Sequence, residues 1–278
     1  MSEVRRTFHQ ELDHIKGDIV RLAAMVTECI PRGTDVLLSN DLQGAQHLIE
    51  DDDVLDSLSL EIEEHCYQVL ALQQPVAIDL RSLVTAIRLV SEIERSGDLM
   101  VNVAKGARRI YGVQFDPRLR GLIERMSEEA TRLFRLSIDA YVEGNASLAS
   151  ALDDMDDSLD LLHKDYIQAI FESHHAGVID LQAAVQLALI GRYYERIGDH
   201  AVNIGARVEY MVTGWLPEHS GAARLVARQG RAEKQLAEQV DEVGDRVEAR
   251  RTRPGESDIL DLDSSPPAGT DGPAPDGR

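Results

Sequence analysis

An internal duplication organises this 278-residue sequence. Residues 94–104 read ERSGDLMVNVA and residues 195–205 read ERIGDHAVNIG, so that six of the eleven positions are identical at an offset of 101. Further upstream, DDVLDSL at 52–58 pairs with DDSLDLL at 156–162 at an offset of 104. The change of offset places a length difference of three residues in the loop between the two matches. Matches on both sides of such a loop indicate two copies of one unit.

Each copy has the pattern of three long helices. Apolar residues recur at helical spacing, and aromatic residues, which favour strands, make up only 4% of the chain. We therefore predict an all-α fold of two tandem antiparallel three-helix bundles, over residues 1–113 and 114–216. Residues 217–278 form a third segment, with a charged, exposed or partner-dependent helix at 221–252 and a disordered acidic tail from 253 onward.

Helix-breaking and capping residues set the expected boundaries in the first copy. Pro31 is expected to kink the first helix or to end it early, because proline lacks the backbone N–H. Asp41 and Asp79 are expected to cap the second and third helices. The three helices are expected at about residues 3–39, 41–72 and 79–112.

The second copy has the same signals. Asp116 is expected to cap the first of its helices, with Pro117 at the first helical position. Gly144 and Asn145 mark a turn, and Asp180 is expected to cap the last helix. The three helices are expected at about residues 117–142, 146–173 and 181–214.

Four pairs of acidic residues stand four positions apart, on or beside the apolar stripes of these helices. Positions i and i+4 share one helix face, and two carboxylates about 4 Å apart repel by about 4 kcal/mol at an effective dielectric constant near 20. Because buried charge without a partner is costly, a bound cation would relieve this repulsion best. If neighbouring helices pack antiparallel, the pairs converge into two four-carboxylate metal sites. These sites are Asp52, Asp56, Glu94 and Asp98 in the first copy, and Asp156, Asp160, Glu195 and Asp199 in the second.

The ligand chemistry of these sites leaves the metal open. Oxygen ligands favour magnesium, calcium or manganese, whereas iron and zinc also accept carboxylates. Asn102 and Asn203 lie one turn further on and are candidate outer or weak ligands. His163 and His200 have no counterpart in the first copy and are expected to be ordinary polar residues. The sequence contains no glycine-rich phosphate loop, nucleophile elbow or cysteine-based zinc motif.

Taken together, these motifs resemble the PhoU family of regulators of bacterial phosphate uptake. The resemblance covers about residues 5–215 and rests on PVAIDLR at 75–81, ERSGD at 94–98, ERIGDHAVNI at 195–204 and the aspartate pairs. It implies two three-helix bundles with metal clusters of iron, zinc, manganese or magnesium on the acidic motifs. It also implies repression of the phosphate-starvation regulon, through contact with the ATPase subunit of the phosphate ABC transporter and with a membrane sensor histidine kinase. The second copy departs from the pattern, with AGVIDLQ in place of PVAIDLR.

Charge and hydropathy restrict the partners and the compartment. The formal net charge of −20 argues against direct binding to nucleic acid. There is no run of about eighteen apolar residues and no signal-peptide pattern, so a cytoplasmic location is expected. A homodimer is expected as well.

Three functional interpretations remain. The first is a metal-binding regulator and adaptor that is not an enzyme. The second is a carboxylate-bridged metalloenzyme on a helical bundle, for which Asp160-x-x-His163 approximates the Glu-x-x-His pattern of such proteins. The third is a metal-free helical scaffold whose acids face water.

Overall fold

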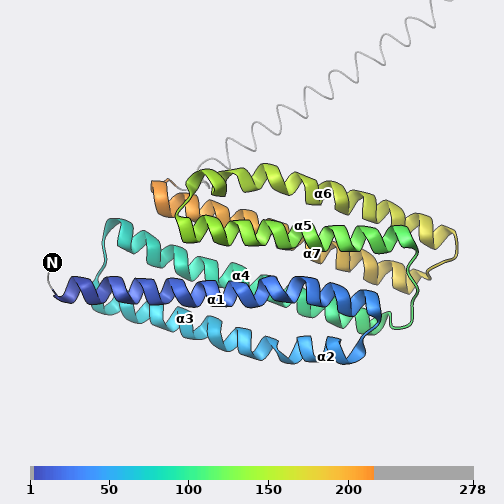
Figure 1. Ribbon diagram of the computed structural model, residues 1–278, viewed down its shortest axis with the longest axis horizontal. Coiled ribbons are helices and arrows are strands. Elements are labelled where there is room, and N and C mark those ends of the chain that lie inside the picture. The colour runs from blue at the N-terminus through green and yellow to red at the C-terminus, as the bar shows by residue number, and fades with distance from the viewer. Residues whose placement is uncertain (1–2, 216–278) are drawn as a thin grey trace, which may run out of the picture. The chain divides into compact units, whose positions relative to one another are not determined.

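The computed structural model describes residues 3–215, and over this range the chain is helical with no strands (Figure 1). The predicted all-α fold is confirmed. The predictions for residues 217–278 lie outside the described residues. The helices are α1 (Glu3–Ser39), α2 (Leu42–Glu50), α3 (Asp52–Gln73), α4 (Ala77–Arg109), α5 (Pro117–Glu143), α6 (Ala146–His175) and α7 (Leu181–Thr213).

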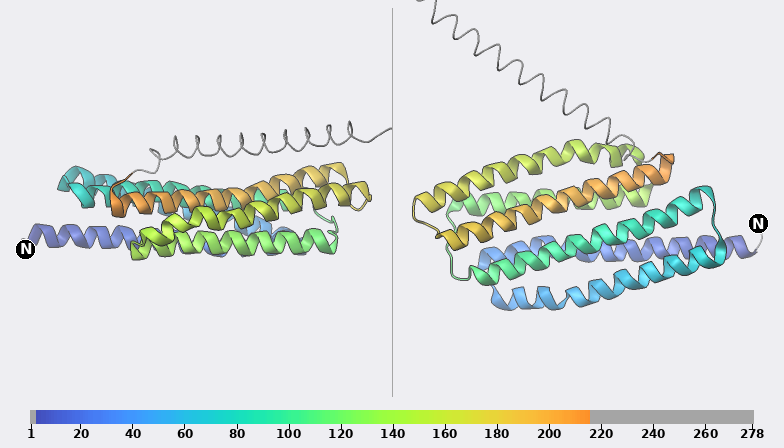
Figure 2. Two further views of the ribbon diagram at one scale, coloured as in Figure 1. Left: turned by 90° about the horizontal axis from the view of Figure 1, so that it is seen from above. Right: turned by 180° about the vertical axis from the view of Figure 1, so that it is seen from behind.

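The two copies of the repeat form two bundles whose helices run lengthwise beside one another (Figures 1 and 2). Helices α1 to α4 make the first bundle, and α5 to α7 make the second. The corresponding helices α4 and α7 pack against each other between the bundles, and α1 packs against α5. Helices α3 and α6 therefore lie on the outer sides of α4 and α7.

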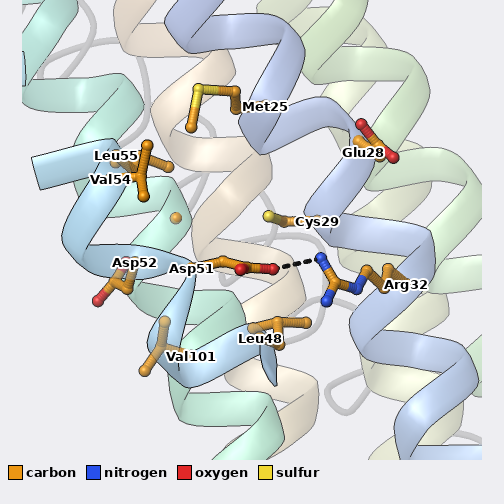
Figure 3. A pocket seen from close by; sticks show the side chains of 11 residues that line it. Met25, Glu28, Cys29, Arg32, Leu48, Asp51, Asp52, Val54, Leu55 and Val101 are labelled. Atoms are coloured by element: carbon orange, nitrogen blue, oxygen red, sulfur yellow. Dashed lines mark hydrogen bonds and ion pairs between the residues drawn. The ribbon is translucent and has the colours of Figure 1, made fainter. Parts of the chain in front are cut away.

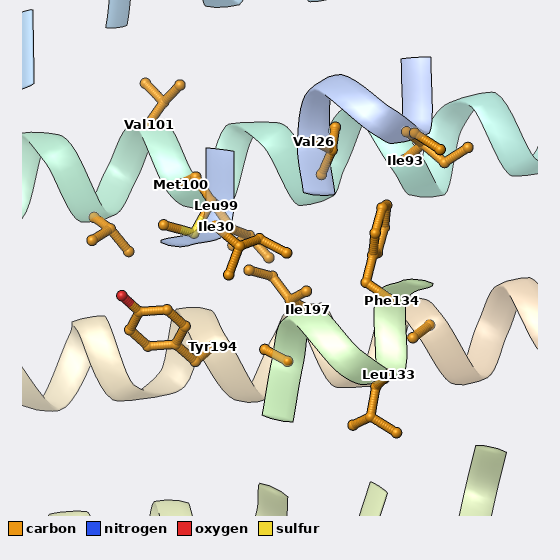
Figure 4. Close-up of a cluster of buried hydrophobic side chains, with 14 of the residues drawn as sticks. Val26, Ile30, Ile93, Leu99, Met100, Val101, Leu133, Phe134, Tyr194 and Ile197 are labelled. Carbon is orange, nitrogen blue, oxygen red and sulfur yellow. The ribbon is translucent and has the colours of Figure 1, made fainter. Parts of the chain in front are cut away.

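A single hydrophobic core joins the two copies. In Figure 4, side chains from α1, α4, α5 and α7 converge, among them Ile30, Phe134 and Ile197, which are all 0% exposed. A buried polar network crosses the same interface, because the Thr34 hydroxyl lies 2.7 Å from both Ser127 Oγ and Tyr194 Oη. Burial on this scale is the main force that holds helices of this length in place.

Three aspartate caps were predicted correctly. The side chain of Asp41 accepts a hydrogen bond from Gly44 N at 2.9 Å, and that of Asp180 accepts one from Ala183 N at 2.7 Å. Asp116 accepts bonds from the backbone amides of residues 118 and 119, with Pro117 in the first turn. These bonds satisfy amides that have no partner inside the helix.

Two boundary predictions were wrong. The expected helix at 41–72 is two helices, α2 and α3, which break at Asp51. Here three consecutive aspartates, which are weak helix formers, interrupt the pattern, and Asp51 forms an ion pair with Arg32 of α1 at 2.6 Å. Asp79 does not cap α4, because that helix begins at Ala77 and Asp79 lies in its first turn, where a negative charge favours the helix N-terminus.

Pro31 does not end α1, which continues to Ser39. The proline side chain is exposed, while Ile30 beside it and Leu37 two turns later are buried in the core. This packing holds the flanking turns in helical conformation although one backbone hydrogen bond is missing. Within residues 3–215, none of the helices is long and apolar enough to cross a membrane.

Candidate functional site

The packing of α3 on α4, and of α6 on α7, carries the four acidic pairs in two separate groups. We call Asp52, Asp56, Glu94 and Asp98 the first acid cluster, and Asp156, Asp160, Glu195 and Asp199 the second. Five of the eight side chains are half-buried, whereas Asp56, Asp98 and Asp199 are exposed. Five of the eight acids are therefore partly shielded from solvent, and three lie on solvated faces of the helices.

In the first acid cluster the carboxylates of α3 and α4 act on one another. The pKa of Asp52 rises to about 6, first because of burial and then because of the negative charges of Asp56 and Asp98. The pKa of Glu94 is also raised, by burial and by the same three aspartates. Lys105 counteracts part of this effect at Asp52. The acids on α3 and α4 are therefore close enough to raise one another's pKa, while their predicted role as one metal site stays a prediction.

The second acid cluster contains the most perturbed carboxyl group among the eight. Burial, followed by the charges of Asp160 and Asp199, raises the pKa of Asp156 to about 7. The Oδ1 atom of Asp156 is buried and has no hydrogen-bond partner. Because a buried carboxylate oxygen normally has a partner, this atom is suited to a cation.

A glycine of the repeated motif makes room for this carboxylate. A Cβ atom at Gly198 would collide with Asp156 Oδ1 and would lie 2.7 Å from Leu159 Cδ2. In the first copy, a Cβ atom at Gly97 would lie 2.9 Å from Leu55 Cδ1. The glycine of each ERxGD motif thus allows the neighbouring helix to approach closely, and in the second copy it allows an acid to enter the gap.

Arg192 distinguishes the two clusters, and it was not predicted as a site residue from the sequence. Its guanidinium group forms an ion pair with Glu195, and Nη2 lies 3.6 Å from Asp199 Oδ2. The corresponding position in the first copy, at the offset of 101, is Ser91. The second cluster therefore has a cationic side chain over part of its acids, and the first cluster has none at this position. The signal was an arginine three residues before Glu195, at ion-pairing distance on a helix.

The two histidines near the second cluster have different surroundings. His163 is half-buried, its Nε2 atom has no hydrogen-bond partner, and burial followed by the charge of Arg192 lowers its pKa. His200 is only 3% exposed, and its Nδ1 atom lies 2.9 Å from Ser96 Oγ on α4. Burial lowers the pKa of His200 to about 4. His200 is thus a polar residue of the interface between α4 and α7.

The predicted outer ligand Asn203 points elsewhere. Its side-chain amide donates to Glu92 on α4 at 3.4 Å, because position 203 lies on the side of α7 that meets the first bundle. This prediction was wrong for the conformation in the structure.

A pocket of about 220 Å³ adjoins the first acid cluster (Figure 3). Asp52 is one of its lining residues, together with Cys29 of α1 and the Arg32–Asp51 ion pair. Burial raises the pKa of the Cys29 thiol, so this cysteine is in the neutral form. Among the acids of the first cluster, Asp52 is the one that lines this pocket.

The acid clusters fit a cation by their chemistry, but their oxygens are spread more widely than one coordination shell. Among residues 3–215, one group of three side chains brings its candidate ligand atoms within 4.8 Å of one another, and it lies outside the acid clusters. This group is formed by Glu11, His14 and His65. This group was not predicted from the sequence, although Glu11-x-x-His14 is a Glu-x-x-His pair. The carboxylates of the two clusters need side-chain rotation to share an ion.

These features define a class of protein, namely a duplicated all-α bundle in which each copy holds an acid cluster at an ERxGD motif. The sequence profile of the PhoU domain matches residues 19–107 and 123–208. The chain therefore belongs to the PhoU family.

Individual relatives agree with this assignment. The chain is 32% identical over 215 residues to the phosphate-specific transport system accessory protein PhoU homolog 1 of Mycobacterium tuberculosis, covering 77% of this chain and 96% of that protein. It is 29% identical to the PhoU homolog of Clostridium acetobutylicum, covering 76% and 96%.

Solved structures show the same fold. The crystal structure of PhoU from Pseudomonas aeruginosa superposes with a TM-score of 0.70 at 26% identity, over 75% of this chain and all of that one. The structure of the phosphate transport system regulatory protein PhoU from Streptococcus pneumoniae also gives a TM-score of 0.70, at 24% identity, over 75% of this chain and 98% of that one.

Proposed function

We propose that this protein is a cytoplasmic, metal-binding regulator of phosphate uptake and phosphate-starvation signalling, and that it is not an enzyme. It acts as an adaptor between the ATPase subunit of a phosphate ABC transporter and a membrane sensor histidine kinase. Its membership of the PhoU family, whose relatives are accessory proteins of the phosphate-specific transport system, supports this role. A homodimer is part of the proposal.

The observation that carries the metal-binding part is the second acid cluster around Asp156. Here Asp156 Oδ1 is buried without a hydrogen-bond partner, in a space that Gly198 keeps open. Burial, followed by the charges of Asp160 and Asp199, raises the pKa of the Asp156 carboxyl group. Iron, zinc, manganese or magnesium would neutralise these charges, and the acid side chains on α6 and α7 would hold the ion. The bound metal would fix the outer surface of each bundle, where α3 and α6 lie.

Two aspartate substitutions test metal binding with matched controls on the same helices. We expect protein purified without chelator to contain metal, and Asp52→Asn and Asp156→Asn each to lower the metal content measured by elemental analysis. The exposed neighbours Asp53 and Asp157 serve as controls, because Asp53→Asn and Asp157→Asn remove the same charge outside the clusters. Equal metal content in all four variants would contradict the role of the clusters.

The adaptor role needs a separate measurement. We expect the purified protein to retain the transporter ATPase subunit or the sensor kinase in a pull-down, and the amount retained to differ between low and high phosphate. Recovery of neither partner at either phosphate level would refute the adaptor role, whatever the metal content.

A further inference from the structure

A cluster of two histidines and a glutamate joins α1 to α3, away from both acid clusters. His65 Nε2 on α3 lies 2.8 Å from Glu11 Oε2 on α1. The rings of His14 and His65 meet edge to face, with centroids 5.4 Å apart. One potential ligand atom from each of the three side chains lies within 4.8 Å of the other two.

The cluster is built on packed helical segments. Ile15 beside His14 is 2% exposed, and Cys66 beside His65 is 0% exposed, so the backbones that carry the histidines are fixed by the core. Glu11 and His14 are three positions apart and therefore share one face of α1. A binding site on such elements keeps its geometry better than a site on loops.

A carboxylate follows one turn after the exposed histidine. Asp18 Oδ2 lies 3.4 Å from His14 Nε2, and the Asp18 side chain is only 24% exposed. Metal-bound histidines usually donate their second ring N–H to a carboxylate, which orients the ring. Arg21 also approaches Asp18, at 3.9 Å, which holds this carboxylate on the same face of α1.

We propose that Glu11, His14 and His65 form a zinc site with Asp18 as the carboxylate that orients His14. Two imidazoles and one carboxylate are a ligand set that zinc accepts, with water in the fourth position, whereas magnesium and calcium prefer oxygen ligands. In a tetrahedral site with bonds of about 2.0–2.1 Å, two ligand atoms lie about 3.3 Å apart. The Glu11–His65 pair therefore needs to separate by only about 0.5 Å to admit the ion.

The site is independent of the metal sites in the proposed function. His65 follows Asp56 by nine residues on α3, which corresponds to about 13 Å along the helix axis. One ion cannot bridge that distance. The His14 side chain is 66% exposed, so the ion can enter from solvent. Once bound, zinc would link the first half of α1 to the second half of α3.

Histidine-ring NMR spectra of the full chain, stripped with chelator and titrated with zinc chloride, test this proposal. We expect zinc to shift the ring nitrogens of His14 and His65, which are assigned by the loss of their signals in His14→Gln and His65→Gln. The control His47→Gln removes an exposed histidine of α2 and should leave both shifts unchanged. Asp18→Asn should weaken zinc binding at this site by about ten- to a hundredfold.

The outcomes separate this site from the acid clusters. Asp52→Asn and Asp156→Asn should leave the zinc-dependent shifts of both histidines intact, even if they abolish metal binding elsewhere. If His65→Gln does not fold, His14→Gln replaces a largely exposed side chain and should still abolish the shift of His65. Unchanged His14 and His65 signals at millimolar zinc would overturn the proposal, as would equal weakening by His47→Gln.

Discussion

Replacing Asp156 with asparagine should stabilise the metal-free protein at pH 8. Asparagine keeps the shape of the side chain but removes a charge that burial and two neighbouring aspartates disfavour. The folded protein raises the pKa of this carboxyl from 3.8 to about 7, so the folded state binds a proton more tightly than the unfolded state. Its contribution to stability is therefore present at low pH and is lost as the pH rises from about 4 to about 7.

The size of the effect follows from this rise in pKa. A difference of about three pH units corresponds to about 4 kcal/mol at 1.36 kcal/mol per unit. Because Asp156 is only half-buried, solvent screens much of the interaction, and we expect about 1–2 kcal/mol. For a chain of this length, that gain raises the midpoint of thermal unfolding by about 2–8 °C.

Thermal unfolding followed by circular dichroism, with chelator present, measures the difference. The gain should appear at pH 8 and disappear as the pH falls to about 3, where the aspartate is mostly protonated in both states. Asp157→Asn, an exposed neighbour, should change the midpoint by much less. With saturating metal the order should reverse, because the wild-type carboxylate gains a cation. A loss of stability in metal-free Asp156→Asn at pH 8 would refute the electrostatic reasoning.

Three further substitutions test the packing and the buried histidine. Gly205→Ala should cost about 1–3 kcal/mol of unfolding free energy in denaturant titrations, because its Cβ atom would lie 2.7 Å from the backbone oxygen of Ala149; an unchanged value would contradict the close approach of α6 and α7. A Cβ atom at Gly121 would have no atom within 4 Å, so Gly121→Ala should instead raise the free energy of unfolding by about 0.5–1 kcal/mol in the same assay. A lower free energy of unfolding would contradict this prediction. The folded protein lowers the pKa of His200 to about 4, so the folded state binds a proton less readily than the unfolded state. As the pH falls from 6.5 to 4, the free energy of unfolding of the wild type should therefore drop by about 2 kcal/mol more than that of His200→Gln. Parallel pH profiles for the two proteins would contradict this assignment.

The sequence was enough to predict most of the fold because its signals are local. Asp41, Asp116 and Asp180 cap helices through bonds to amides two or three residues away, so no tertiary contact is needed to recognise them. Because the acidic motifs occur in both copies, the duplication also made it possible to predict which helices carry acids near one another. The break at Asp51 was missed because it depends partly on Arg32, which is 19 residues distant in the sequence and belongs to another helix.

The candidate sites show the same limit. The acids that α3 and α4 bring together could be predicted because the motif occurs twice, and each copy supports the reading of the other. The Glu11–His65 contact joins residues 54 positions apart and occurs in one copy only. Its Glu-x-x-His half was visible in the sequence, but the second histidine lies on a different helix, and only packing reveals that it is near.

The arginines of the two ERxGD motifs neutralise the acid clusters only in part. Burial, followed by the positive charges of Arg95 and Arg196, lowers the pKa of His200, which lies between α4 and α7. Arg196 also counteracts part of the rise in the pKa of Asp199, a rise that burial causes first. The motif arginines therefore act both on the interface between the bundles and on acids of the clusters. Arg95 is the last and weakest influence on Glu94, behind burial and three aspartates. In the first acid cluster the pKa values of Asp52 and Glu94 stay raised although Lys105 and Arg95 lower them in part. This cluster therefore keeps an excess of negative charge, which is the basis on which we propose that it binds a cation.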